Sequence, residues 1–263
     1  VLCANPALTS ITAGNLFNVA GNAVVNVGDG SGADSSAGII VAPNLASELP
    51  TPTTLNLFDL DGTGNKMYVY SDGHVQVGGG NKSNMRLNGN ANGLSGGPKL
   101  HMFGGKINVT GSLSLNTGDS VYVQGGTLNI GLVASSGTNT ITFATNNPGD
   151  STAFIVDGGS VYVGDGNSAF TIGNGDNIPS FDTGAVDAYN AFELKSGVFY
   201  LNGRFSLNDA TSRFVVSGGN FYINPTGSQD LTGTNSILLL QRGIVDFSGG
   251  TITLVNPNPY SGT

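Results

Sequence analysis

The feature that most constrains the fold of this chain is a ten-residue motif with a glycine near its centre. Its pattern is apolar, x, apolar, x, x, Gly, x, apolar, x, apolar, and its copies read YVYSDGHVQV, LHMFGGKINV, VYVQGGTLNI, FIVDGGSVYV, FELKSGVFYL, FVVSGGNFYI and LLLQRGIVDF. Side chains on a strand change face at every residue, and glycine accepts the positive φ of a corner. The motif therefore predicts two short strands that meet at a bend, repeated along the chain.

The spacing of the central glycines indicates a solenoid. Gly105 to Gly126, Gly197 to Gly219 and Gly219 to Gly243 are each about 22 residues apart, whereas the other intervals are longer by about ten to sixteen residues. Several copies continue into a third strand, as in INVTGSLSL and FYLNGRFSL. We therefore expect an all-β, three-sided β-solenoid of about eight coils, in which each strand pairs in parallel with its equivalent in the next coil.

The repeats extend along most of the 263 residues and predict a single domain, 1–263, with variable loops between coils. Glycine-rich and proline-rich stretches without alternation mark the interruptions. We expect an entry segment at 1–15, loop insertions at 42–54, 88–98, 131–139 and 174–190, and a C-terminal tail at 256–263.

Charge and composition limit the partners of the chain. A net charge of −8 with nine scattered lysines and arginines argues against nucleic acid and against anionic membranes, and no apolar run is long enough to span a bilayer. Cys3 is the only cysteine, which excludes an internal disulfide. Low lysine content with abundant Gly, Asn, Ser and Thr is typical of exported surface proteins, so we expect an extracellular or cell-surface location. A first residue Val1 is expected for a processed chain or a piece of a longer one.

A row of tyrosines is the first candidate binding surface. The position three residues after the motif glycine faces outward and is Tyr162, Tyr200 and Tyr222 in three successive coils. Stacked rings on a flat β face suit sugars, which have an apolar face and polar edges, and they equally suit a protein partner. The row is also consistent with a cross-strand ladder that only stabilises the fold.

The last coil is the second candidate surface, because its core residues have no following coil to cover them. Partial exposure of six such side chains costs several kcal/mol, at roughly 1.5–3 kcal/mol for each fully buried one. Bare solenoid ends also template edge-to-edge association. The residues of this predicted end-stacking surface are Leu238, Leu240, Val245, Phe247, Ile252 and Leu254. Either the chain continues in a longer protein, or a second copy packs on this end.

One acidic segment is a candidate for calcium. FDLDGTGNK places oxygen-bearing side chains at alternate positions, among them Asp59, Asp61 and Asn65, from which they can wrap a hard cation. The segment lacks a closing bidentate glutamate, and the same residue types are common in turns. No other cofactor is expected, since His74 and His101 have no acidic partner in register.

The motif and the coil length together resemble the right-handed parallel β-helix class, the pectin-lyase-like architecture, over roughly residues 16–255. The segments GGTLNIG, SGGNFYIN and SGGTITL are most similar to repeats of bacterial surface adhesins and autotransporter passengers. This resemblance implies a non-catalytic structural or adhesive rod that self-associates or forms part of a longer surface protein. A carbohydrate-binding module is the alternative. A polysaccharide lyase or hydrolase is less favoured, because no pair of outward carboxylates lies in register and the motifs of the galacturonan-cleaving enzymes are absent.

Overall fold

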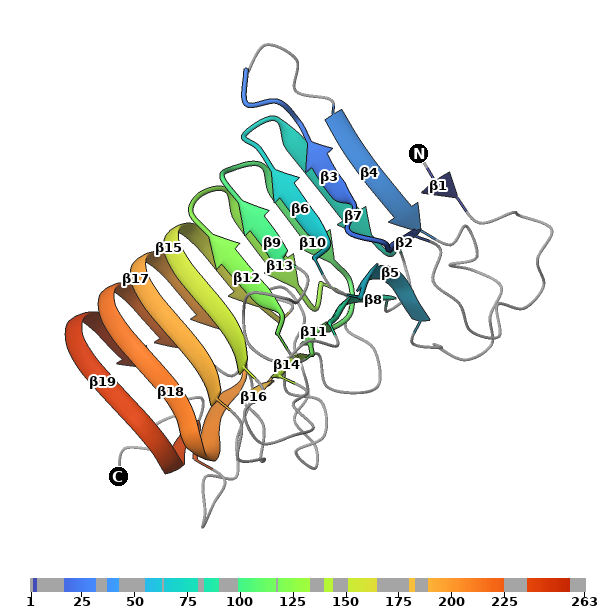
Figure 1. Cartoon of the computed structure of the whole chain (residues 1–263). Coiled ribbons are helices and arrows are strands. Elements are labelled where there is room, and N and C mark those ends of the chain that lie inside the picture. Colours follow the sequence, from blue (N-terminus) through green and yellow to red (C-terminus); the bar gives the residue numbers. More distant parts are fainter. Residues whose placement is uncertain are drawn as a thin grey trace.

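The chain forms one parallel β-sheet that winds repeatedly along a single direction. The computed structural model describes residues 2–3, 17–31, 37–42, 55–62, 64–79, 83–89, 99–116, 118–132, 140–143, 151–164, 180–182, 189–224 and 236–255. Within these residues there are 19 strands and no helix. Successive strands follow one another from the N-terminal to the C-terminal end (Figure 1). The predicted all-β, solenoid-like architecture is confirmed.

The strand pairings sort into three ladders. The first ladder joins β3 (Val24–Val27), β6 (Lys66–Val69), β9 (Lys99–Met102) and β12 (Ser120–Val123). The second joins β1 (Leu2–Cys3), β4 (Ala37–Ala42), β7 (Gly73–Val77), β10 (Lys106–Val109) and β13 (Thr127–Ile130). The third joins β2 (Phe17–Val19), β5 (Leu55–Asp61), β8 (Ser83–Asn88), β11 (Leu113–Leu115), β14 (Thr140–Phe143) and β16 (Ser180–Asp182).

Towards the C-terminus the strands become long and turn the corners without a break. β15 (Ser151–Val163) and β17 (Tyr189–Leu201) each belong to the first and second ladders. β18 (Arg204–Ile223) and β19 (Leu238–Leu254) run through all three. All of these pairings are parallel, as the spacing of the motif predicts.

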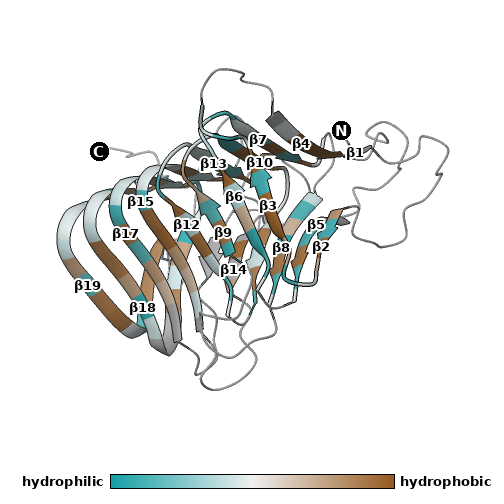
Figure 2. Cartoon of the chain, turned by 45° about the horizontal axis from the view of Figure 1, so that its top comes forward, coloured by the Kyte–Doolittle hydropathy of each residue, from teal (hydrophilic) through white to brown (hydrophobic). Residues whose placement is uncertain are grey.

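The core is a set of inward rows that run along the ladders. Hydrophilic and hydrophobic residues alternate along the strands (Figure 2), and from β6 to β18 the inward apolar residues are buried. In the first ladder Val121 pairs with Phe154, which pairs with Phe192, which pairs with Phe214. Phe192 lies against its neighbours with ring centroids 4.9 Å from Phe199 and 5.6 Å from Phe214. Each strand thus buries apolar area on the strand before it, which is the main stabilising force of a solenoid.

The corner between the first and second ladders explains the glycine of the motif. Gly126 has φ +75°, and a Cβ at this position would lie 2.3 Å from the carbonyl oxygen of Gly105 in the preceding turn of the chain. No side chain fits there without moving the backbone, and non-glycine residues disfavour this φ. The corner therefore requires glycine for both conformation and space.

The last copy of the motif is placed differently from the prediction. The corner above Gly219 is formed by Gly250, whose added Cβ would meet the carbonyl of Gly219 at 2.7 Å, while Arg242 pairs with Asn208 at another corner. The prediction that Gly243 occupies the motif position is wrong. The sequence offers two glycine-centred patterns in this region, and the one with the paired glycines SGG continues the column.

Most of the predicted insertions lie outside the described residues. This holds for the tail at 256–263 and for most of 1–15, 42–54, 88–98, 131–139 and 174–190. Two segments within those ranges are strands: Leu2–Cys3 forms β1 and pairs with β4, and Ser180–Asp182 forms β16 in the third ladder. No helix long and apolar enough to cross a membrane occurs among the residues that the structure describes.

Candidate functional site

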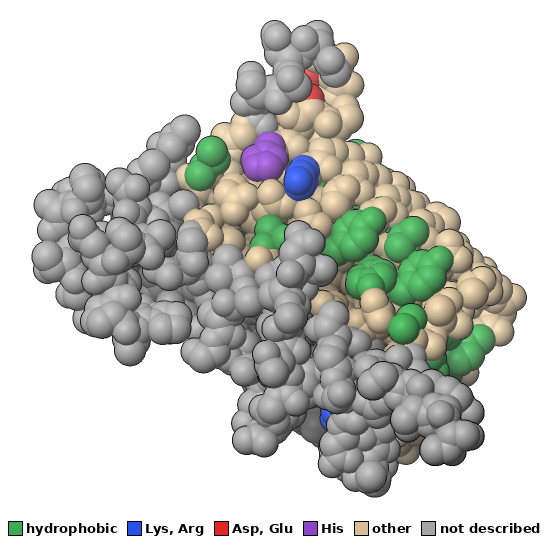
Figure 3. Space-filling model, turned by 180° about the vertical axis from the view of Figure 1, so that it is seen from behind, with side chains coloured by type: hydrophobic (Ala, Val, Ile, Leu, Met, Phe, Trp, Pro, Cys, Tyr) green, Lys and Arg blue, Asp and Glu red, His purple; other side chains and the backbone are tan. Residues whose placement is uncertain are grey.

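The tyrosine row lies in register on the outward side of the second ladder. Tyr162 pairs with Tyr200, and Tyr200 pairs with Tyr222. The ring centroids are 6.1 Å apart in both pairs, with interplanar angles of 41° and 38°. Hydrophobic side chains gather on one face of the molecule viewed from behind (Figure 3). Because the rings are tilted, they form a ridge of edges and faces rather than one flat platform.

The tyrosine row continues a ladder of side-chain amides. Asn129 pairs with Tyr162 and donates a hydrogen bond of 2.8 Å to Oδ1 of Asn108, whose amide donates one of 3.0 Å to Oε1 of Gln76. Asn224 donates a hydrogen bond to the Tyr200 hydroxyl. These cross-strand contacts stabilise the stacked strands, and the same row therefore has a structural role in addition to any binding role. Asp246 lies three residues after Gly243, the spacing that defines this row, but it pairs with Val215 of the first ladder, and Thr253 is the register partner of Tyr222.

The apolar C-terminal surface consists of six inward side chains of β19, and we call it the terminal rung. These are Leu238, Leu240, Val245, Phe247, Ile252 and Leu254. Its six residues pair with Phe205, Leu207, Phe214, Val216, Phe221 and Ile223, all fully buried. The terminal rung itself stays open, with Phe247 50% and Leu254 48% exposed. A hollow of about 420 Å³ lies between Leu238, Phe247, Ile252 and Leu254. Among the described residues β19 pairs only with β18, so its other edge presents unpaired backbone groups.

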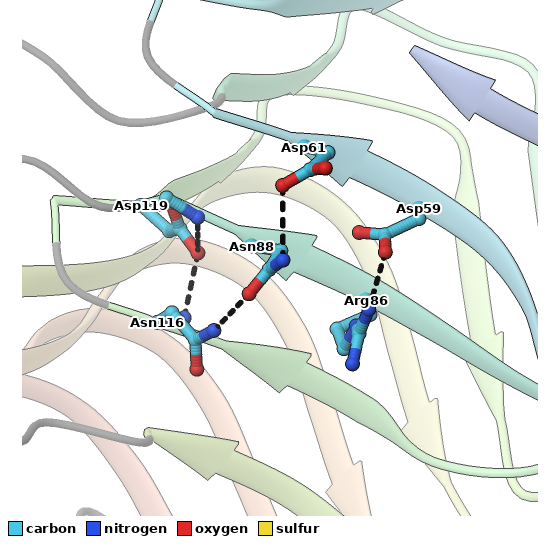
Figure 4. A network of polar contacts seen from close by, with 7 residues as sticks. Asp59, Asp61, Arg86, Asn88, Asn116 and Asp119 are labelled. Atoms are coloured by element: carbon cyan, nitrogen blue, oxygen red, sulfur yellow. Dashed lines mark hydrogen bonds and ion pairs between the residues drawn. The ribbon is translucent and has the colours of Figure 1, made fainter. Parts of the chain in front are cut away.

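The residues of the predicted calcium site have other partners. Asp59 is fully buried and its Oδ2 accepts an ion-paired hydrogen bond of 2.5 Å from Arg86 (Figure 4). Asp61 accepts a bond of 3.0 Å from the Asn88 side chain, and the side-chain oxygen Oδ1 of Asn65 accepts one of 2.8 Å from the Ala23 backbone N–H. The three side chains thus face three different donors, not one common point. Within the described part of the chain no three His, Cys, Asp or Glu residues gather closely enough to hold a metal ion.

A buried carboxyl lies beside this network. Asp119 is fully buried, and its Oδ2 accepts hydrogen bonds from the backbone of Asn116 at 2.6 Å and of Gly89 at 3.3 Å (Figure 4). Burial raises the pKa of Asp119 to about 8, against the lowering effect of the two backbone donors, because removal from water disfavours the charged form. The Asp119 carboxyl is therefore protonated over most of the neutral range.

A third surface, which the sequence did not predict, lies on the outward side of the first ladder. A groove of about 330 Å³ is lined by two rows of residues from β6, β9, β12 and β15. We call it the aromatic groove. One row pairs Lys66 with Lys99, and the other pairs Tyr68 with His101 and His101 with Tyr122. Ile155 continues the second row and pairs with Tyr122.

Hydrogen bonds fix the rings of the aromatic groove. His101 Nε2 lies 2.7 Å from Gln124 Oε1, and since an amide oxygen can only accept, Nε2 is the donor. Gln124 donates to the Tyr122 hydroxyl at 3.1 Å, and Tyr122 donates to Asp157 Oδ2 at 2.8 Å. The bond to Asp157 raises the pKa of the Tyr122 phenol, because it stabilises the protonated form. The rings are therefore held in place before any ligand arrives.

Sequence reasoning missed the aromatic groove because of one extra residue at a corner. Between Val69 and Gly73 there are three residues, whereas between the equivalent Met102 and Gly105 there are two. Alignment on the glycines therefore predicts that Tyr68 points inward, while the structure pairs it with the outward His101. Alignment on Met67 and Val69 gives the correct face for Tyr68. Alignment on Gly243 likewise places Leu239 on this outward side, but Leu239 belongs to the third ladder, where it pairs with Ser206.

No family model matches the chain, and neither the curated proteins nor the solved structures give a match. The resemblance to bacterial surface β-helices therefore stays a prediction.

Proposed function

We propose that this chain is a three-sided, right-handed parallel β-helix of about eight coils that works as a non-catalytic, extracellular structural or adhesive rod and associates with itself end to end. The terminal rung is the observation that carries this proposal. Its six side chains belong to core rows that are fully buried one strand earlier, yet Leu240, Val245, Phe247 and Leu254 are 38–50% exposed. Covering them is worth on the order of 5 kcal/mol, if about half of each side chain is newly buried.

A second copy is a suitable cover because β19 offers matching backbone as well as apolar area. Its free edge runs through all three ladders, so an added strand gains main-chain hydrogen bonds on each side of the solenoid. A contact between unlike ends does not close on itself and propagates into a filament. A surface rod that polymerises, or that continues into further coils of a longer protein, fits this geometry. The same surface supports the prediction of an adhesin or passenger-like protein.

Sedimentation velocity over a range of concentrations tests self-association. The wild type should form larger species as concentration rises, and Phe247→Lys should shift it towards the single chain, because a buried lysine at the contact is costly. Val215→Lys is the matched control: it makes the same kind of change on the outward side of β18, between Glu193 and Asp246. A wild type that stays a single species at all concentrations, or a Val215→Lys variant that loses association equally, contradicts the proposal.

Polysaccharide binding by the tyrosine row is the second candidate function. The register of Tyr162, Tyr200 and Tyr222 favours it, because the 6.1 Å ring separations give three successive contacts for a sugar chain. Replacement of all three by alanine should reduce retention on an insoluble neutral polysaccharide. Unchanged retention removes this candidate. A reducing-sugar and unsaturated-product assay over a polysaccharide panel tests the non-catalytic claim, and cell fractionation of the source organism tests the extracellular one.

A further inference from the structure

The aromatic groove contains two cations without an acidic partner in the lining. Lys66 and Lys99 are register partners on adjacent parallel strands, which lie about 4.8 Å apart. The two ion pairs found among the described residues belong to Arg86 and Lys195, not to these lysines. Like charges directly opposite each other destabilise a sheet. In a chain with a net charge of −8, such a pair is an unusual concentration of positive charge and is complementary to an anion.

The row beside the lysines supplies stacking surfaces. The Tyr68 and His101 ring centroids are 6.1 Å apart, and those of His101 and Tyr122 are 4.8 Å apart. Phe103, which is 45% exposed, stacks on Tyr70 at 5.4 Å and extends this aromatic surface. Rings of this kind contact the apolar face of a sugar while their polar atoms contact its hydroxyl groups. Because hydrogen bonds already hold His101 and Tyr122, binding costs little ordering entropy.

We propose that the aromatic groove binds an acidic polysaccharide, with Lys66 and Lys99 contacting its carboxylate or sulfate groups and Tyr68, His101 and Tyr122 contacting its sugar rings. Two carboxylates beside this row are engaged: Asp157 accepts a hydrogen bond from Tyr122, and Glu193, the register partner of Ile155, lies 3.6 Å from Lys195. A nucleic acid would need a longer run of cations than one pair, because its phosphates are densely spaced. The overall negative charge disfavours unspecific polyanion binding, so recognition depends on this local pair.

The ligand class differs from that of the tyrosine row. The outward neighbours of the tyrosine row in the same strands are Ser160, Val198 and Asn220, none of which is charged. That face suits a neutral sugar, whereas the aromatic groove suits an acidic one. The proposal here does not depend on end-to-end association or on the tyrosine row, and each of the three can fail separately.

Affinity electrophoresis of the whole chain in gels containing polysaccharide tests the proposal. Alginate supplies carboxylates, dextran sulfate supplies sulfates, and plain dextran is the neutral polymer. The wild type should be retarded by one or both acidic polymers and not by dextran. Lys99→Gln should weaken binding by about fivefold to tenfold, and Tyr122→Leu by a similar factor. Lys106→Gln is the matched control: it removes the same charge from the outward side of the second ladder and should leave binding unchanged.

Several outcomes overturn the proposal. These are no retardation by either acidic polymer, equal retardation by dextran, and equal weakening by Lys99→Gln and Lys106→Gln. Inorganic polyphosphate serves as a competitor without sugar rings. If it displaces alginate fully and Tyr122→Leu has no effect, the groove recognises charge alone and the assignment to sugar is wrong. Far-UV circular dichroism and the unfolding midpoint of each variant exclude a loss caused by misfolding.

Discussion

Replacement of the corner glycine Gly126 by alanine separates the two reasons for which the fold requires glycine. Gly126 and Gly21 have nearly the same backbone conformation, with φ +75° and +74°. An alanine Cβ at Gly21 meets no atom within 4 Å, whereas at Gly126 it would lie 2.3 Å from the Gly105 oxygen and 2.5 Å from the Gly104 carbonyl carbon. Gly21→Ala therefore measures the conformational cost alone, and Gly126→Ala adds the cost of close stacking.

The magnitudes follow from this comparison. The left-handed conformation costs alanine about 1–2 kcal/mol at either site. At Gly126 the neighbouring turn must also move by roughly 1 Å to restore an ordinary contact, because real Cβ atoms are not found closer than 3.0 Å. This movement stretches the hydrogen bonds from Thr127 to Gly105 and from Ser160 to Gly126, each now 2.9 Å long. At about 1 kcal/mol for each bond, Gly126→Ala should cost about 3–4 kcal/mol in total.

Equilibrium unfolding in urea, followed by far-UV circular dichroism, measures both variants. The expected result is a free energy of unfolding lower by about 1–2 kcal/mol for Gly21→Ala and by about 2 kcal/mol more for Gly126→Ala. Equal losses in the two variants would contradict the close contact, because they would show that Gly126 has no near neighbour. A Gly126→Ala variant as stable as the wild type would refute it as well.

Three further predictions concern buried groups. The folded state keeps the Asp119 proton up to about pH 8, whereas the unfolded carboxyl loses it near 3.8. The free energy of unfolding should therefore fall as pH rises through this window, by up to ~6 kcal/mol. Asp119→Asn should remove this dependence in urea titrations at several pH values. Phe192→Ala should lower the free energy of unfolding by about 3–5 kcal/mol in the same assay, because it opens a cavity between stacked rings. Phe103→Ala, at an exposed position, should lower it by less than about 1 kcal/mol. Equal losses would contradict the predicted core. Arg86→Met should lower the melting temperature, at a cost of about 3 kcal/mol in stability, because it removes the ion-pair partner of the buried Asp59. Asp59→Asn in the same chain should recover part of the lost stability. An unchanged melting temperature in Arg86→Met would mean that the pair does not stabilise the fold.

The strands and their parallel stacking could be predicted because the motif combines two independent signals. Alternation fixes which residues face inward, and a glycine at a constant place marks the corner. Phe154, Phe192 and Phe214 therefore appear in one buried row, as their positions in the motif indicate. The tyrosine row follows from the same alternation, since Tyr162 and Tyr200 occupy equivalent outward positions.

The aromatic groove could not be predicted because alternation has a period of two, and a single extra residue reverses the face of every residue before it. The additional residue between Val69 and Gly73 has this effect on Tyr68. The Gly243 error has a different cause, because two glycine-centred patterns overlap there and only the pairing of Phe221 with Ile252 distinguishes them. The partners of Asp59 and Asn65 depend on contacts between distant segments, which local spacing does not reveal.

A disulfide between Asn108 and Asn129 tests whether equivalent residues of successive turns lie directly above one another in parallel register. These residues are register partners, and a strand spacing of about 4.8 Å lies within the Cα separation of a disulfide. In a chain with Cys3→Ser, the variant with Asn108→Cys and Asn129→Cys should form one intrachain disulfide under mild oxidation, detected by peptide mass spectrometry. The diagonal pair, Asn108→Cys with Thr127→Cys, lies about 7–8 Å apart and should remain reduced. Oxidation of the diagonal pair in preference to the register pair would contradict the stacked arrangement.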